Sequence, residues 1–196
     1  MSGMARVMFV LGGPACGKGT ACQAAELTGN FWHISAGELL RQNVPSEHKD
    51  LVEKCFTEGR IVPAHITVDL LHQRMKKLGW SSKPFLIDGF PRNMLNYNTW
   101  FSQMPLASVE KAVYFWCPEH LFLERLKKRQ GKRSDDNETT IGKRMQSFKI
   151  DTIPVIQRFR SQGILNTIDV SGSVEDMNKE FFKVLNQKTL ESSLSK

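Results

Sequence analysis

Residues 12–20 read Gly-Gly-Pro-Ala-Cys-Gly-Lys-Gly-Thr and form the most informative stretch of the chain. An apolar run, Val7-Met8-Phe9-Val10-Leu11, precedes this stretch, and a helix-compatible segment, residues 21–27, follows it. A glycine loop between a strand and a helix can wrap a phosphate chain with backbone N–H groups and a helix N-terminus. We therefore predict a phosphate-binding loop with Lys18 as its mobile positive charge. The strict pattern has Ser or Thr directly after the lysine, whereas here Gly19 comes before Thr20.

The bulk composition predicts one globular domain with a full core. The chain has 196 residues, of which 40% are hydrophobic and 24% charged. No apolar run approaches the roughly 20 residues of a membrane span, so we expect no membrane association. The four cysteines are scattered without a Cys-x-x-Cys pair, which argues against a disulfide framework or a zinc site. We expect a monomer in a reducing compartment, the cytoplasm or the nucleus.

The net charge of +7 has two explanations, a nucleic-acid surface or a pocket for polyanionic small molecules. The longest basic cluster covers residues 127–133, and Ser134-Asp135-Asp136-Asn137 follows it directly. Such a cluster alone is more often a solvated face or an RNA-binding patch than a catalytic element.

Strand and helix patterns alternate along the chain. Apolar runs at residues 7–11, 31–34, 85–87, 113–116 and 164–170 predict five strands, and their continuous hydrophobicity indicates a sheet covered on both faces. Apolar residues at helical spacing predict helices around residues 68–78, from Pro118 onward, over residues 141–159 and over residues 174–185. Within the third of these, Pro154 predicts a kink or a break. The alternation predicts an α/β fold with a parallel sheet between two layers of helices.

Three polar, glycine-bearing turns follow the first three strands. They are the glycine loop, Ser35-Ala36-Gly37-Glu38 and Asp88-Gly89-Phe90-Pro91-Arg92. Open parallel sheets bind ligands outside the carboxyl ends of their strands. The three turns are therefore expected to meet at one cleft.

Several residues of these turns have a structural and a functional interpretation. Ser35 and Glu38 match a capping box, and Arg41, one turn further along that helix, could hold a second phosphate group. Asp88 either positions Mg²⁺ through water or bonds loop amides. Arg92 adds another cation directed at phosphate.

Five motifs in order resemble the nucleoside monophosphate kinase family, the adenylate kinase-like proteins. They are Gly-Gly-Pro-x-x-Gly-Lys-Gly-Thr, Ser-Ala-Gly-Glu-Leu-Leu-Arg, Glu58-Gly-Arg-Ile-Val-Pro63, Phe85-Leu-Ile-Asp-Gly-Phe-Pro-Arg-Asn93 and Arg133-Ser-Asp-Asp-Asn-Glu138. The Lys-Gly-Thr sequence is the form of the loop in this family. The resemblance implies a P-loop three-layer α/β/α fold with a five-stranded parallel sheet, a helical insertion that binds the monophosphate, and a short lid. It divides the single kinase domain into a core (1–35, 63–128 and 138–196), the insertion (36–62) and the lid (129–137).

The resemblance also implies an activity and roles for individual residues. ATP would donate a phosphoryl group, with Mg²⁺ held by Asp88 through water and not by direct protein ligands. Catalytic roles are implied for Lys18, Arg92, Arg133, Arg144 and Asp88. ATP-binding roles are implied for Gly13, Pro14, Ala15, Cys16, Gly17, Lys18, Gly19, Thr20, Arg125 and Arg129. Acceptor-binding roles are implied for Ser35, Ala36, Arg41, Ile61, Val62, Gly89, Arg92, Asn93, Asn96, Arg133 and Arg144. The basic cluster becomes a lid over the phosphates, ordered by Asp135 and Asp136, and the nucleic-acid interpretation is set aside.

The acceptor is expected to be a pyrimidine nucleoside monophosphate. Adenylate kinases typically have Gln four residues beyond the Phe-Pro-Arg arginine, where this chain has Asn96. Phe-Pro-Arg-Asn-x-x-Asn and Ala36 resemble the UMP-CMP kinase branch, which implies CMP or UMP and adds dCMP as a candidate. The alternatives are an adenylate kinase that uses AMP, and a nucleotide-binding assembly factor without kinase activity. Ala15 departs from the family's usual glycine, a residue that can supply a special backbone angle.

Overall fold

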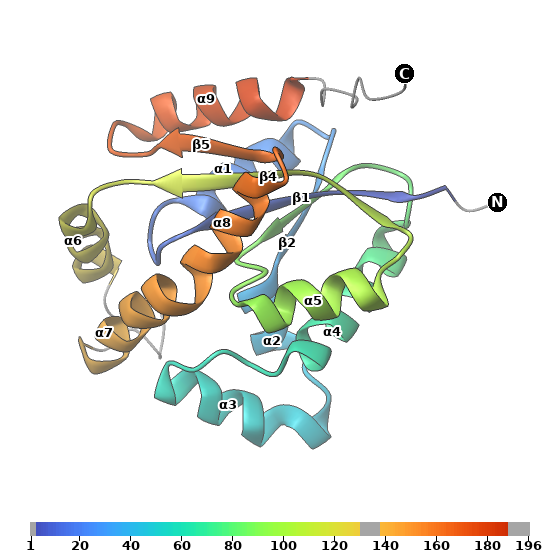
Figure 1. Ribbon diagram of the computed structural model, residues 1–196, viewed down its shortest axis with the longest axis horizontal. Coiled ribbons are helices and arrows are strands. Elements are labelled where there is room, and N and C mark those ends of the chain that lie inside the picture. Colours follow the sequence, from blue (N-terminus) through green and yellow to red (C-terminus); the bar gives the residue numbers. More distant parts are fainter. Residues whose placement is uncertain (1–2, 130–137, 188–196) are drawn as a thin grey trace.

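The computed structural model describes residues 3–129 and 138–187, with the backbone alone at 127–129 and 138–140. Its centre is a sheet of five parallel strands in the order β2-β3-β1-β4-β5 (Figure 1). The strands are β1 (Ala5–Gly12), β2 (Trp32–Ser35), β3 (Phe85–Asp88), β4 (Ala107–Trp116) and β5 (Leu165–Asp169). The order confirms the predicted parallel α/β fold and places β1, with its glycine loop, in the middle of the sheet.

Helices cover both faces of this sheet. They are α1 (Lys18–Leu27), α2 (Ala36–Gln42), α3 (Lys49–Glu58), α4 (Ala64–Leu78), α5 (Met94–Gln103), α6 (Glu119–Arg129), α7 (Glu138–Ser147), α8 (Ile153–Ser161) and α9 (Val174–Asn186). A 3-10 turn, η1 (Ser46–His48), precedes α3, and a π-helical turn, η2 (Phe148–Thr152), joins α7 to α8. In Figure 1, α3 lies at the bottom of the view, while α9 and β5 lie at the top. Among the described residues, no helix is long and apolar enough to cross a membrane.

Strand β1 divides its side chains between two hydrophobic cores. Val7, Phe9 and Leu11 join the core under α4, α5 and α8, whereas Met8 and Val10 join the core under α1 and α9. This alternation is expected of a strand buried on both faces, because successive side chains of a strand point to opposite sides. It confirms the predicted three-layer α/β/α arrangement.

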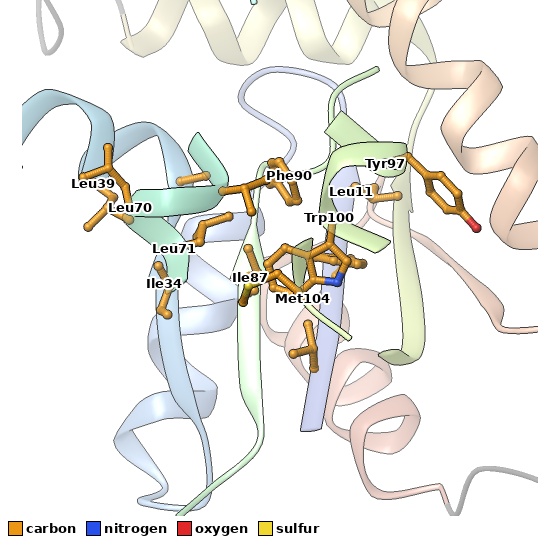
Figure 2. Close-up of a cluster of buried hydrophobic side chains, with 14 of the residues drawn as sticks. Leu11, Ile34, Leu39, Leu70, Leu71, Ile87, Phe90, Tyr97, Trp100 and Met104 are labelled. Carbon is orange, nitrogen blue, oxygen red and sulfur yellow. The ribbon is translucent and has the colours of Figure 1, made fainter. Parts of the chain in front are cut away.

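Aromatic packing anchors the turn that follows β3. Phe90, which is 1% exposed, comes two residues after Asp88, and its ring centroid lies 5.7 Å from that of Trp100 on α5. Figure 2 shows Phe90 and Trp100 among the buried side chains of this core. Trp100 in turn packs edge-on against Phe9 of β1 at 5.2 Å. The buried Phe90 ring holds the turn against the core, and this anchors the main chain that carries Asp88 and Arg92.

Local structure differs from the sequence prediction at three places. Strand β4 begins at Ala107, well before the predicted residue 113, because its first residues already pair with β1, Ser108 with Arg6, ahead of a register shift between Val7 and Met8. Ser35 stands at the N-cap of α2, but its side chain makes no capping hydrogen bond, so the predicted capping box is not formed. Pro154 lies in the first turn of α8, and the predicted kink takes the form of the π-helical turn before it.

Candidate active site

The ends of β1, β2 and β3 open into one cavity with a volume of about 460 Å³. Most of the predicted site residues line it: Pro14, Ala15, Cys16, Gly17, Lys18, Gly19, Thr20, Ser35, Arg41, Ile61, Asp88, Gly89, Arg92, Arg125 and Arg144. These residues come from all three glycine-bearing turns and from α2, α6 and α7. The structure therefore brings together the predicted donor-side and acceptor-side residues around a single space.

A smaller pocket continues from this cavity towards α5. Ala36, Val62 and Asn96 line it, together with Phe56 of α3. Gly89 and Arg92 line both spaces, so the two are neighbours. The predicted acceptor residues are thus divided between the main cavity, which holds most of the cations, and a small pocket with a single buried amide.

Two predicted site residues, Gly13 and Asn93, do not line either space, and two more are not described at their side chains. Gly13 accepts a hydrogen bond from Lys18 through its carbonyl group, and its Cα faces the Phe122 ring. Asn93 caps α5, where its side chain accepts a hydrogen bond of 2.7 Å from the Asn96 N–H. The side chain of Arg129, all of Arg133 and the lid predicted for 129–137 lie outside the described residues, apart from the backbone of Arg129.

The glycine loop holds Lys18 against its own carbonyl groups. Lys18 Nζ donates to the carbonyl oxygens of Gly12 (3.0 Å) and Gly13 (2.8 Å), and also to Cys16 Sγ at 3.3 Å. These contacts place the ammonium group at the cavity wall beside the N-terminus of α1. A phosphate group that enters can replace the carbonyl partners, because charge-assisted hydrogen bonds to phosphate are stronger than those to neutral acceptors.

Ala15 adopts a left-handed backbone conformation, with φ of +59°. Among the described residues, it is the one residue other than glycine with a positive φ. A Cβ atom makes this conformation unfavourable, and glycine carries no such cost. The structure therefore confirms that this position has the backbone angle at which glycine is the usual residue.

Two arginines of the cavity lie against glycines. Arg41 Nη1 donates to the Gly37 carbonyl at 3.0 Å, and the Arg41 guanidinium lies 4.8 Å from the centre of the Phe56 ring. Arg92 Nε donates to the Gly89 carbonyl at 2.9 Å. A Cβ added to Gly37 would lie 3.3 Å from Arg41 Nη1. The glycine therefore gives the Arg41 guanidinium room beside the main chain.

Asp88 lies deeper in the cavity, and His33 lies beside it. Asp88 is 8% exposed, and its Oδ2 atom is 3.9 Å from His33 Nε2. His33 Nε2 is buried and has no hydrogen-bond partner among the described residues. The sequence analysis assigned no role to His33. Its position on β2, two residues before Ser35, was an available signal, because residues two apart on a strand share a face.

Arg125 and Arg144 line the cavity from α6 and α7. Arg125 Nη2 donates to the Val170 carbonyl at 2.7 Å, which fixes the guanidinium at the rim. Together with Lys18, Arg41, Arg60 and Arg92, these residues place six cations of the described part of the chain around the cavity. Glu38 and Asp88 are the carboxylates that line the same cavity within the described part of the chain. Such a surplus of positive charge favours a polyanionic ligand.

Asn96 is the polar residue at the end of the smaller pocket. Its side chain is 2% exposed, and its Oδ1 atom accepts a hydrogen bond from the Arg92 N–H at 3.1 Å. Its Nδ2 atom is buried and has no hydrogen-bond partner among the described residues. An unpaired buried donor is costly, and a ligand that accepts its hydrogen bond removes the cost.

Two of the thiols near the glycine loop are held in the neutral form. Burial raises the pKa of Cys117 to about 11, although Arg125 opposes the shift. Burial also raises the pKa of Cys22 well above its usual value, and Asp88 adds to the effect. All four cysteines are free and buried. The described residues contain no group of three or more His, Cys, Asp or Glu that could hold a metal ion.

Comparison with known proteins gives one consistent family. Residues 10–164 match the family described as adenylate kinase. The UMP-CMP kinase of Sus scrofa is 38% identical over 192 residues, which cover 93% of this chain and 97% of that protein. The UMP-CMP kinase of Homo sapiens is 39% identical over 191 residues (92% and 97%), and the probable UMP-CMP kinase 1 of Arabidopsis thaliana is 41% identical over 175 residues (87% and 83%). The chain belongs to the adenylate kinase family of nucleoside monophosphate kinases.

Proposed function

We propose that this protein transfers the γ-phosphoryl group of ATP to a pyrimidine nucleoside monophosphate, either CMP or UMP, with dCMP as a further acceptor. An oxygen of the acceptor phosphate forms a new bond to the γ-phosphorus as the bond to the β-phosphate oxygen breaks. The products are ADP and a pyrimidine nucleoside diphosphate. The similarity to proteins named UMP-CMP kinase supports this choice of acceptor.

The cations of the main cavity support direct transfer. Phosphoryl transfer needs in-line positioning and fixed positive charge around the transferring group, and little covalent chemistry from the protein. We assign Lys18 to the transferring group, Arg41 and Arg92 to the acceptor phosphate, and Arg125 and Arg144 to ATP. Arg129 and Arg133 are proposed as further phosphate ligands from the lid. Donor-side and acceptor-side residues line the same cavity, which suits transfer without a covalent enzyme intermediate.

The residues around Asp88 are suited to a magnesium ion that arrives with ATP. Asp88 supplies a carboxylate and Thr20 a hydroxyl in the same cavity, and oxygen ligands are those that Mg²⁺ prefers. Asp88 would hold the ion through water. Bound Mg²⁺ neutralises negative charge that develops on the phosphate oxygens.

Asn96 is the observation that carries the choice of a pyrimidine. Asn96 lines the smaller pocket, its Oδ1 atom accepts from the Arg92 N–H, and its buried Nδ2 atom has no hydrogen-bond partner among the described residues. O4 of uracil and N3 of cytosine are acceptors that such a donor can reach on a base edge. Asn is one methylene shorter than the Gln of adenylate kinases, and a pyrimidine is smaller than a purine. We infer that Asn96 reads the base while Arg92, four residues earlier, holds the phosphate.

The test is a coupled assay that offers CMP, UMP, dCMP and AMP separately with saturating ATP and Mg²⁺. We expect CMP or UMP to have the highest kcat/KM. AMP as the best acceptor would replace the proposal with an adenylate kinase activity. Steady ATP hydrolysis without phosphorylation of any monophosphate would support a nucleotide-binding assembly factor instead.

A matched pair of variants tests the role of Asn96. Asn96→Asp keeps an oxygen for the Arg92 N–H and replaces the NH₂ group by an acceptor. We expect the KM for the pyrimidine monophosphate to rise at least about tenfold, with the KM for ATP unchanged. Asn98→Asp makes the same change at an exposed position of α5 and should leave both KM values unchanged. Equal behaviour of the two variants would remove Asn96 from the base site.

We further propose that the enzyme works as a monomer in a reducing compartment such as the cytoplasm, in keeping with its four free thiols. Light scattering of the active protein measures the oligomeric state, and a stable dimer would contradict this part of the proposal.

A further inference from the structure

The π-helical turn η2 lies at the edge of the active-site cavity. It connects α7, which carries Arg144, to α8. Ser147, Phe148 and Thr152, at and beside the turn, all line the cavity. A π-helical turn adds a residue to a helix, and such turns are frequent at functional sites. The extra residue changes which side chains face the cavity before and after the turn, so η2 is a candidate for a specific task.

Thr152, the last residue of η2, is joined directly to the acceptor side of the site. It is 7% exposed, and its hydroxyl group donates a hydrogen bond of 2.8 Å to the carbonyl oxygen of Arg92. The two residues are 60 positions apart in the sequence. This bond connects the helices on the lid side of the cavity with the turn after β3.

The main chain of Arg92 is held by side chains on both of its polar groups. Its N–H donates to Asn96 Oδ1 at 3.1 Å, and its carbonyl accepts from Thr152. Its side chain is tied back by the bond from Nε to the Gly89 carbonyl at 2.9 Å. Arg92 itself is an exposed residue, and these bonds contribute to the direction in which its guanidinium leaves the chain.

We propose that Thr152 is a positioning residue for the acceptor phosphate, acting through the main chain of Arg92. This inference rests on the proposed function, in which Arg92 holds that phosphate. Without the hydroxyl group, Arg92 keeps its charge but loses one of the two bonds that orient its backbone. Small errors in orientation cost catalytic rate, because phosphoryl transfer depends on alignment. Thr152 itself makes no contact with the reacting atoms in this proposal.

The test compares Thr152→Val, which is nearly isosteric but lacks the hydroxyl, with Thr152→Ser, which retains it. For Thr152→Val we expect the KM for CMP or UMP to rise and kcat to fall, with kcat/KM for the acceptor about three- to tenfold lower and the KM for ATP unchanged. Thr152→Ser should stay within about twofold of the wild type. If the valine variant does not fold, Thr152→Ala takes its place. Alanine also lacks the hydroxyl group but is smaller, and we expect the same changes in kcat and KM.

Two further measurements separate positioning from a merely structural role. In an Arg92→Ala background, Thr152→Val should change kcat/KM by less than about twofold, because the residue through which it acts has been removed. Ser161→Ala removes a similar bond, 2.8 Å from Ser161 Oγ to the Arg158 carbonyl, at the end of α8 and away from the cavity. This control should leave both KM values unchanged.

The outcomes of this test and of the function assay are distinct. If Thr152→Val lowers the melting temperature but leaves the acceptor KM and kcat unchanged, the inference about Thr152 is wrong and the function stands. The inference is also wrong if the effect of Thr152→Val persists in full in the Arg92→Ala background. If the wild-type protein phosphorylates no monophosphate, the proposed function itself fails.

Discussion

At the scale of single residues, Ala15 carries a backbone cost that its substitution can measure. Its φ of +59° is a conformation that glycine adopts freely and alanine does not. We expect Ala15→Gly to change the free energy of unfolding by between zero and about +1 kcal/mol, since relief of strain outweighs the greater freedom of glycine in the unfolded chain. The kcat/KM for ATP should be equal or higher.

Chemical unfolding and steady-state kinetics on the same preparation test this expectation. Ala24→Gly, the same change inside α1, is the matched control and should cost about 1 kcal/mol, because glycine destabilises a helix interior. We therefore expect Ala15→Gly to leave the free energy of unfolding unchanged or higher, and Ala24→Gly to lower it. A large loss of activity in Ala15→Gly would mean that the loop has adapted to alanine, and the strain argument would fail.

At the scale of elements, Lys111 connects the last helix to the sheet. It lies on β4, is 5% exposed, and its Nζ donates to the carbonyl oxygens of Val184 (2.8 Å) and Gln187 at the end of α9. A cation at a helix C-terminus also interacts favourably with the carbonyl groups that have no partner within the helix. Burial lowers the pKa of Lys111, while the neighbouring Glu110 opposes the shift.

Loss of this contact should destabilise the protein without touching the active-site cavity. We expect Lys111→Met to lower the free energy of unfolding by about 2 kcal/mol, because hydrogen bonds from a charged donor are lost. Urea denaturation provides the measurement. Lys183→Met on α9 removes an exposed lysine that is 3.7 Å from Glu180, and it should cost less than about 0.5 kcal/mol. Similar losses in both variants would show that Lys111 contributes no more than a surface ion pair.

The same elements indicate how much the sequence alone could predict. The sheet, the helical layers and the convergence of three turns were predictable, because hydrophobic runs and glycine motifs are local signals. The contacts of Thr152 and Lys111 could not be predicted. Their partners are 60 and 73 residues away and are backbone carbonyl groups, which nearly every residue has whatever its side chain, so no residue type marks them in the sequence. Ser35 and Glu38 matched a capping box, yet Ser35 makes no capping bond and both residues line the cavity.

At the scale of the whole molecule, positive charge is concentrated at the cavity beyond the carboxyl ends of the strands, between the two helical layers. The composition alone allows two explanations for the net charge of +7, and the six described cations around one cavity favour the pocket for polyanions. Arg41 and Arg92 are exposed, and removal of either should act on ligand binding more than on folding, because exposed charges contribute little to stability. The stability of the whole molecule should therefore depend on pH through groups elsewhere, which makes the histidines away from the cavity informative.

His72 is such a group, on α4, with its ring packed edge-on at 5.4 Å from the Trp80 ring. Burial lowers the pKa of His72 below its usual 6.5, Lys76 one turn further on lowers it too, and Asp69 opposes the shift. The unfolded chain therefore binds a proton near pH 6.5 that the folded chain binds only at lower pH. As the pH falls below about 6.5, the free energy of unfolding should fall, and it should level off below the folded-state pKa. Above pH 7.5 this contribution to stability is fully present.

The measurement is urea denaturation at pH 7.5 and pH 5.5 of the wild type and His72→Gln. We expect the variant to lose less stability on acidification than the wild type, because its side chain has no proton to bind. An NMR titration that placed the pKa of His72 at 6.5 would remove the expected effect, and one that placed it above 6.5 would reverse its sign; either result would exclude this origin for acid sensitivity.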